Sequence, residues 1–366
     1  MYYGFKFKSR LSIVTTLFVA LLLSGCLASL LDVPGSAYNN ETEQLSKLLK
    51  EGDNVNGFND AGVAGIHYAA KAGNLKALRI LLDNGADVNL KAINKYNGWS
   101  PLHFAMTIPK YNSSRYQYKK LDVVKLLVQK GAKLDYKGPN GESLLHIASA
   151  QAYKGSDKIT AYLISSGLNI NEKDSKGKTP FDYALKNLSF SNITVLMKNG
   201  VNFNNYKGPD GSSLFHLAAG EVLRTNSALD FIDYLISQGY DINKVDENKK
   251  TALHYVYKID IDEKNKKYLQ LKTDAVATLI KKGANLTAQD NYGNTVGHYA
   301  ACDGNIGVVS IYRALYKKYN LSNVRNKKNQ TIEELYKGYA NWHNKVADPN
   351  TSVKEMLLLK YPPSCI

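Results

Sequence analysis

The feature of this sequence that most constrains its fold is a four-residue element that recurs along the chain. Each copy begins with Ser, Thr or Ala, and six of the seven copies end in histidine. Repetition at a spacing of roughly 20 to 50 residues is typical of solenoids, in which stacked units share one core. The copies, here called slots, occupy residues 64–67, 100–103, 143–146, 179–182, 213–216, 251–254 and 295–298.

Residues 64–89 show what one repeat contains. Apolar residues recur at helical spacing on both sides of Gly73 and Asn74, so the sequence predicts two short amphipathic helices around a turn. Gly85 is placed to end the second helix as a C-cap glycine. Because a helix pair of this size cannot bury its apolar face alone, it requires stacked neighbours.

These residues resemble an ankyrin repeat. The slot 64–67 stands where the family has Thr-Pro-Leu-His, Ala69 and Ala70 follow it, and residues 85–89 close the unit with the sequence GADVN. The resemblance covers roughly residues 42–340 and implies a mainly α fold, a solenoid of helix-turn-helix units with β-hairpin fingers. Similar closing elements begin at Gly131, Gly167, Gly200, Gly239 and Gly283.

The ends of the array are interpreted as caps of one elongated domain. Residues 45–56 resemble the second helix of an N-terminal capping repeat. Residues 331–334 form a decayed slot that carries charges, as a polar-faced terminal cap requires, and we expect a helix over 353–359 to complete it. The predicted organisation is therefore repeats with their N-terminal cap over 41–340 and a C-terminal capping segment over 341–366.

The spacing within the repeats is uneven. Extra residues fall between the two helices of a repeat, most clearly over 107–120 and 257–274. Such insertions either form loops on one edge, often a binding edge, or lengthen the helices. The sequences at 136–141 and 206–211 are near copies, YKGPNG and YKGPDG, which we expect at the tips of fingers because Pro and Gly favour turns.

The start of the chain predicts export. Three basic residues precede the uncharged stretch 11–23, a pattern typical of a secretory signal peptide, here residues 1–25. The following residues 23–26, LSGC, resemble the lipobox of bacterial lipoproteins, which implies that Cys26 is acylated and becomes the N-terminus. Residues 26–40 are then a lipidated tether. Leu27 after the cysteine implies the outer membrane, on its periplasmic side; the alternative is a simple signal peptide or an uncleaved anchor.

The charge of the chain favours acidic partners. Without the three basic residues of the signal, 44 Lys and Arg oppose 32 Asp and Glu, a net charge near +12. Such an excess attracts acidic proteins or anionic lipids, and export argues against nucleic acid. The alternative interpretation is a lysine-rich, solvated surface with no specific role.

Two cysteines remain besides Cys26. Cys302 and Cys365 both lie toward the C-terminus, and an oxidising periplasm permits a disulfide between them. Two unpaired thiols are the alternative.

The sequence contains no set of residues that indicates catalysis. Six histidines occupy the slots, one per repeat, where the resemblance implies that they bond the backbone of adjacent units; they are too widely spread to share a metal ion. Nucleophile motifs and phosphate-binding glycine loops are absent. We therefore expect neither an enzyme nor a cofactor.

Tyrosine is common, with 26 residues, and several tyrosines lie among basic residues at predicted finger or insertion positions. Tyr, Trp and Arg often carry the energy of protein binding because rigid rings bury area at low entropy cost. The alternative is that these rings pack on neighbouring fingers. The candidate partner-binding residues are Lys95, Tyr96, Trp99, Tyr111, Tyr116, Tyr118, Tyr136, Lys137, Tyr206, Lys207 and Tyr292.

A lipobox joined to ankyrin repeats resembles the immunity lipoproteins that protect bacteria from type VI secretion phospholipase effectors. The resemblance implies one protein partner, a secreted lipase toxin that the chain binds and inhibits in the periplasm, with no oligomer expected. Two alternatives stay open: a scaffold or stress-related protein that binds endogenous envelope partners, and direct binding of anionic lipid or polysaccharide.

Overall fold

The computed structural model describes residues 32–96, 98–107, 120–203, 206–257, 266–303, 305, 307–311, 314 and 324–347. Several predictions fall outside these residues, namely those for Cys26, Tyr111, Tyr116, Tyr118, Cys365 and the helix over 353–359. Among the described residues, no helix combines the length and the apolar character that crossing a membrane requires.

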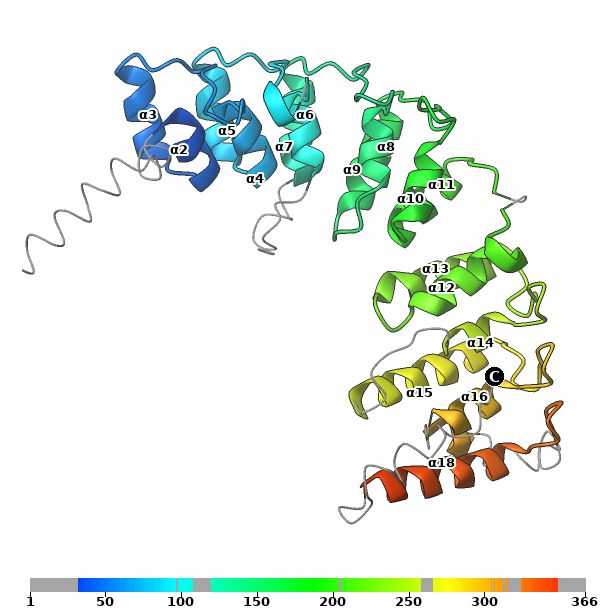
Figure 1. The fold of residues 1–366 in the computed structure, drawn as a ribbon. Helices are drawn as coiled ribbons and strands as arrows, with labels where there is room; N and C mark the ends of the chain where they lie inside the picture. The colour runs from blue at the N-terminus through cyan, green and yellow to red at the C-terminus, as the bar shows by residue number, and fades with distance from the viewer. Residues whose placement is uncertain are drawn as a thin grey trace, which may run out of the picture. The chain divides into compact units, whose positions relative to one another are not determined.

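The chain divides into two compact units, residues 1–201 and 202–366, where the sequence predicted one domain. Each unit is built from pairs of helices, which confirms the predicted helix-turn-helix repeats (Figure 1). The helices of the first unit are α2 (Val33–Asn39), α3 (Thr42–Lys50), α4 (Gly65–Ala72), α5 (Leu75–Asp83), α6 (Pro101–Met106), α7 (Lys120–Gln129), α8 (Leu144–Ser149), α9 (Ser156–Ser165), α10 (Pro180–Lys186) and α11 (Phe190–Lys198), with a short 3-10 helix η2 (Asn94–Tyr96). Those of the second are α12 (Leu214–Glu221), α13 (Asn226–Ser237), α14 (Ala252–Tyr255), α15 (Lys266–Lys281), α16 (Val296–Cys302) and α18 (Ile332–Ala347), with the 3-10 helix η4 (Pro209–Gly211).

Each slot begins the first helix of a repeat. Its first residue has extended backbone and is the N-cap, and the fourth residue, usually His, accepts a hydrogen bond from the N-cap N–H. In the repeat of α8, Nδ1 of His146 lies 3.1 Å from the backbone nitrogen of Ser143. Gly73 ends α4 with a φ of 75°, a left-handed conformation that glycine adopts without strain.

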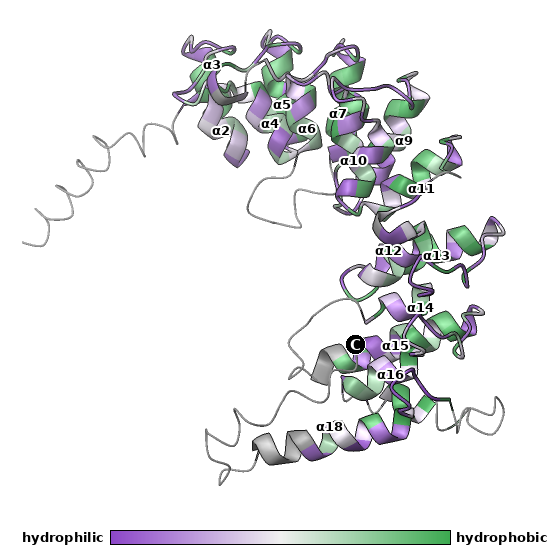
Figure 2. Ribbon diagram, turned by 45° about the vertical axis from the view of Figure 1, so that its right-hand side comes forward, coloured by the Kyte–Doolittle hydropathy of each residue, from purple (hydrophilic) through white to green (hydrophobic). Residues whose placement is uncertain are grey.

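The core of each unit lies between the stacked helix pairs. Helix α4 packs between α2 and α6, and its Ile66 is fully buried together with Leu78 and Leu81 of α5. Burying one such side chain contributes roughly 2 kcal/mol, so each pair depends on its neighbours. Figure 2 shows hydrophobic residues along the helices and hydrophilic residues in the loops that join them.

The loops before the slots are hairpins, here called fingers. In the finger before α10 the N–H of Asp174 donates to the carbonyl of Lys178 at 2.9 Å, and the finger before α14 repeats this bond between Asp246 and Lys250. Among the described residues the strand pairing is limited to isolated bridges: Phe58 with Ala64, Lys137 with Ser143, and Arg325 with Thr331. The fingers are therefore short hairpins rather than a sheet.

Residues 26–40 were predicted to be a tether, but the folded part of the chain already begins within this segment. Helix α2 occupies the second half of that segment, and its Val33 and Ala37 are buried. Asp32 caps the helix by accepting a hydrogen bond from the N–H of Gly35 at 2.6 Å, and Pro34 lies in the first turn, where no N–H is required. The Pro-Gly-Ser sequence that suggested a linker is thus the start of a helix.

The predicted boundary at residue 340 falls inside α18. In the decayed slot, Glu334 accepts a hydrogen bond from the backbone N–H of Thr331 at 2.8 Å, and the N–H of Glu334 lies 3.2 Å from the Thr331 hydroxyl oxygen. Glu334 therefore performs the capping role that histidine has in the other slots.

Candidate partner-binding face

The slot histidines other than His103 tie each repeat to the following finger. Their Nδ1 atoms accept a hydrogen bond from the backbone, so Nε2 carries the proton and donates to a carbonyl oxygen. His146 reaches Lys178 at 2.9 Å, His216 reaches Lys250 at 2.7 Å, and His254 reaches Asn294 at 3.1 Å. In each case the accepting carbonyl belongs to the residue directly before the next slot. The histidines are thus structural, as the family resemblance implied, and the described residues contain no group of three or more metal-ligating side chains placed to hold an ion.

Three fingers are closed by a buried carboxylate. One oxygen of Asp246 accepts from the N–H groups of Asn248 and Lys250, each at 2.8 Å, and the other accepts from the hydroxyl of Tyr255 at 2.9 Å. The same arrangement joins Asp174 to Tyr183 at 2.8 Å and Asp290 to Tyr299 at 2.6 Å. In each pair the tyrosine follows the aspartate by nine residues.

Successive fingers are also joined through their backbones. In the first unit the N–H of Ser175 donates to the carbonyl of Asn140 at 2.9 Å. In the second unit, Asn291 donates to Asn248 and Lys327 donates to Tyr292, both at 2.8 Å. Within each unit, these bonds make neighbouring fingers part of one supported row, which favours side chains held in fixed positions for binding.

His103 departs from the pattern of the other slot histidines. It is fully buried, its Nδ1 lies 3.2 Å from the backbone nitrogen of Ser100, and its Nε2 has no hydrogen-bond partner among the described residues. The ring of Tyr136 meets the imidazole edge to face, with ring centroids 4.2 Å apart. Burial lowers the pKa of His103 to about 3, so the ring is neutral and its Nε2–H is an unsatisfied donor.

The predicted residues Tyr96, Trp99 and Tyr136 come together around His103. Tyr96 and Trp99 both contact the buried Phe104, at centroid distances of 4.9 and 5.9 Å, and Trp99 lies 5.7 Å from His103. All three predicted residues are half-buried. They belong to two successive fingers, where the partly exposed rings contribute to the surface and the buried His103 links Trp99 to Tyr136.

Two lysines and one isoleucine border this surface. The Nζ of Lys71 lies 5.7 Å from the centroid of the Tyr96 ring, and that of Lys91 lies 5.6 Å from the centroid of Tyr136. Ile93 is 47% exposed, unusually high for a large apolar side chain. We call this surface the finger cluster; it consists of Lys71, Lys91, Ile93, Tyr96, Trp99 and Tyr136. The sequence did not single out Lys71, Lys91 or Ile93.

The remaining described candidates are not members of the finger cluster, although Lys95 and Lys137 adjoin it in sequence. Lys137 is in an ion pair with Glu172, which partly neutralises it. Lys207 is exposed, and Tyr292 is exposed by 54% on a finger of the second unit. Lys95 lies in η2. Cys302 is the last residue of α16 and is disulfide-bonded, which argues against the alternative of an unpaired thiol there. That its partner is Cys365 stays a prediction, because Cys365 lies outside the described residues.

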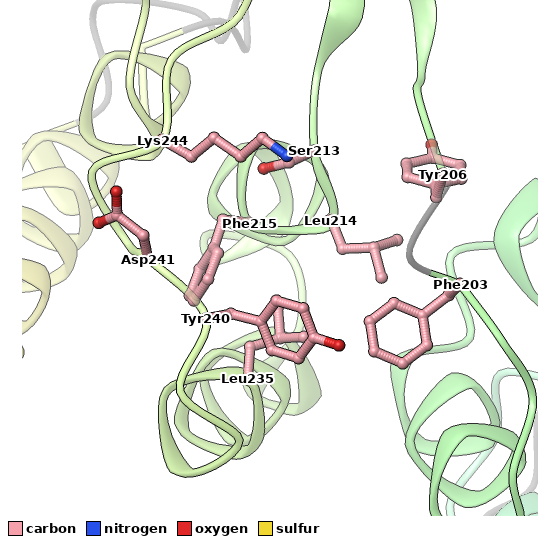
Figure 3. A pocket seen from close by; sticks show the side chains of 9 residues that line it. All are labelled: Phe203, Tyr206, Ser213, Leu214, Phe215, Leu235, Tyr240, Asp241 and Lys244. Carbon is pink, nitrogen blue, oxygen red and sulfur yellow. The ribbon is translucent and has the colours of Figure 1, made fainter.

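The second unit has a small pocket of about 60 Å³ that is lined mainly by aromatic and other apolar side chains (Figure 3). The rings of Phe203 and Tyr240 lie next to each other with centroids 5.2 Å apart, and Phe215 of α12 lines the same space. The predicted Tyr206 belongs to this pocket, and Lys244 extends along its edge toward Ser213 (Figure 3). Sequence reasoning missed Phe203 and Tyr240, which are the fourth and the second residue of their closing elements.

Comparison with known proteins identifies the repeats. A family model described as ankyrin repeats in three copies matches residues 35–113, 112–207 and 215–328. A homolog of the transient receptor potential cation channel subfamily A member 1 from Caenorhabditis elegans is 34% identical over 35% of the chain. A putative ankyrin repeat protein of fowlpox virus is 31% identical over 40%, and the neurogenic locus notch homolog protein 1 of Xenopus laevis is 26% identical over 56%. The matched segments are 9%, 19% and 7% of these relatives' lengths, respectively.

Proposed function

The chain belongs to the ankyrin-repeat family, whose members are typically binding scaffolds rather than enzymes, and we propose that its fingers and first helices hold one partner protein. The observation that carries this proposal is the finger cluster, where three half-buried aromatic side chains gather on two neighbouring fingers. Rigid rings of this kind supply most of the binding energy at protein interfaces.

The finer proposal is that the chain is an immunity lipoprotein. Acylation at Cys26 places it on the periplasmic side of the outer membrane, where a secreted lipase would attack the bilayer. Stable anchoring requires more than one acyl chain, and the acylated cysteine of bacterial lipoproteins supplies it. A repeat scaffold that covers the active site or the membrane-docking surface of such a toxin would inhibit it without any chemistry of its own.

A competition experiment tests the immunity role. Cells that lack this gene are mixed with sibling cells that deliver a secreted lipase effector of the same strain, and survival is compared with that of cells carrying the intact gene. We expect the deletion strain to be killed and the complemented strain to survive. Equal survival of both strains would refute the immunity role.

Affinity capture with the purified full chain distinguishes the immunity function from the alternative scaffold function. If affinity capture with the full chain, solubilised in mild detergent, recovers endogenous envelope proteins and no lipase, the scaffold function replaces the immunity function. Capture of one lipase that loses activity when mixed with the purified chain supports inhibition.

A further inference from the structure

Lys71 and Lys91 differ from the lysines of the first unit that pair with a carboxylate. Lys130 pairs with Asp83 at 3.5 Å and Lys137 pairs with Glu172. Among the described residues, neither Lys71 nor Lys91 has a carboxylate within ion-pair distance, and each ammonium instead lies against a tyrosine ring. A ring face attracts the cation but accepts none of its N–H bonds in the way a carboxylate does. Both ammonium groups are therefore oriented and still able to donate.

The finger cluster also carries apolar side chains. Ile93 is 47% exposed, and its backbone is fixed because its N–H donates to the carbonyl of Gly62 at 2.9 Å. Tyr96, Trp99 and Tyr136 present half-buried rings on the same two fingers. An apolar centre bordered by charge is the arrangement found at protein interfaces, where the centre excludes water from the polar rim.

The unsatisfied Nε2–H of His103 lies beneath this surface. A buried donor without an acceptor costs about 1 to 3 kcal/mol, and the slot histidines His146, His216, His254 and His298 all avoid this cost. Natural proteins break such local rules mainly where function requires it. His103 differs from these four in having the ring of Tyr136 against its imidazole and, among the described residues, no acceptor for Nε2.

We infer that the finger cluster binds an acidic segment of the partner protein, with carboxylates on Lys71 and Lys91 and an apolar or aromatic side chain over Ile93. Carboxylates would form charge-assisted hydrogen bonds with ammonium groups that the fold leaves unpaired. This inference rests on the proposed binding function and adds the location and the chemistry of recognition.

A defined peptide tests the inference. The probe is a fluorescein-labelled peptide with two Asp-Glu pairs around a central Leu-Tyr, and its control is the same peptide with Asn and Gln in place of Asp and Glu. Binding to the full chain is followed by fluorescence polarisation in 50 mM and 300 mM salt. We expect the acidic peptide to bind, the amide peptide to bind at least tenfold more weakly, and added salt to weaken the acidic peptide.

Matched variants locate the site. The double variant Lys71→Gln, Lys91→Gln should weaken the acidic peptide about tenfold. Lys125→Gln should leave binding unchanged, because Lys125 also lies against a ring, 5.9 Å from the centroid of Tyr162, but belongs to the second helix of its repeat. Equal losses in both variants, no binding of the acidic peptide, or full competition by phosphatidylglycerol vesicles would each overturn the inference.

Failure of this inference differs from failure of the proposed function. A partner that is captured by the full chain and binds Lys71→Gln, Lys91→Gln as tightly as wild type contradicts only the acidic-segment inference. Failure to capture any protein in cells that deliver the toxin contradicts the binding function itself.

Discussion

At the scale of single residues, buried hydrogen-bond donors satisfy the carbonyl groups at the ends of first helices. Asn74 donates to Ala37 and Tyr38, which end α2, at 2.9 and 2.7 Å. Asn192 donates to Ala148 and Ser149 at the end of α8, both at 3.2 Å. Since the last carbonyls of a helix lack partners within it, these side chains tie each repeat to the preceding one.

Lys120 also donates to carbonyl groups near the ends of first helices, but its donor is a charged ammonium group. It is 1% exposed, and its Nζ donates to the carbonyls of Lys71, Ala105 and Thr107, the first two at 2.9 and 3.1 Å. Burial lowers the pKa of Lys120 to about 7, so a substantial fraction is protonated at neutral pH.

Lys120→Met should therefore leave three carbonyls without a donor and lower the free energy of unfolding by about 3 kcal/mol. The exposed Lys76 of α5 provides the control, and Lys76→Met should change stability by less than about 0.5 kcal/mol. Urea unfolding at pH 7 measures both variants, and equal midpoints would contradict the role given to Lys120.

The buried slot histidines predict sensitivity to mild acid. Burial lowers the pKa of His67 and of His298 to about 4, below the ordinary value of about 6.5 in an unfolded chain. Between these values the unfolded chain binds protons that the folded chain does not, so stability is complete above pH 6.5 and falls as the pH drops toward 4.

Each such histidine should contribute on the order of 3 kcal/mol to this loss. Urea midpoints measured from pH 7 to 4.5 should decrease steadily. A midpoint that stays constant over this range would show that the histidines are already protonated or are not buried.

At the scale of elements, side-chain hydrogen bonds join the finger before α14 to this helix. The hydroxyl of Tyr255 donates to Asp246, whose side chain also holds the turn of the finger, and both residues are buried. Burial, reinforced by Asp246, raises the pKa of Tyr255, so its hydroxyl remains a donor at neutral pH.

Tyr255→Phe should remove this bond, leave a buried carboxylate oxygen unsatisfied and lower the free energy of unfolding by about 1 to 3 kcal/mol. Tyr292→Phe is the matched control, since Tyr292 is 54% exposed. If thermal unfolding shows the same midpoint for the two variants, the finger does not depend on the Asp–Tyr bond.

The sequence predicted the helix pairs more completely than the side-chain contacts between them and the fingers. Slot spacing predicted the helix pairs because capping and apolar periodicity are local properties. The Asp–Tyr pairs were visible as a nine-residue spacing but were not recognised, because only the folded finger shows their bond. The Pro-Gly-Ser sequence hid α2, since only the burial of Val33 and Ala37 distinguishes a helix there from a linker.

The candidate site was predictable in part. Tyr96, Trp99 and Tyr136 were proposed for their residue type and their finger positions, and the structure places them together. Lys137 was grouped with them, but Glu172, which is 35 residues away in sequence, neutralises it. The sequence of one finger does not predict an ion pair with a residue this far away in the chain.

At the scale of the whole molecule, we propose that the protein is held at a membrane and binds one partner. Cys26→Ala should abolish acylation and move the protein from the membrane to the soluble fraction. Metabolic labelling with an alkyne-bearing fatty acid, followed by fractionation, measures both effects. Label that persists in Cys26→Ala would contradict lipidation at this residue.

The measurement that most directly tests the central claim is photo-crosslinking in living cells. The photoreactive amino acid benzoylphenylalanine is introduced at Ile93 in the finger cluster and, as a control, at the exposed Lys76 of α5. In cells that deliver the toxin, we predict one discrete adduct from position 93, containing a single partner protein, and none from position 76. Adducts from position 76 alone, or the same products from both positions, would contradict binding at the finger cluster.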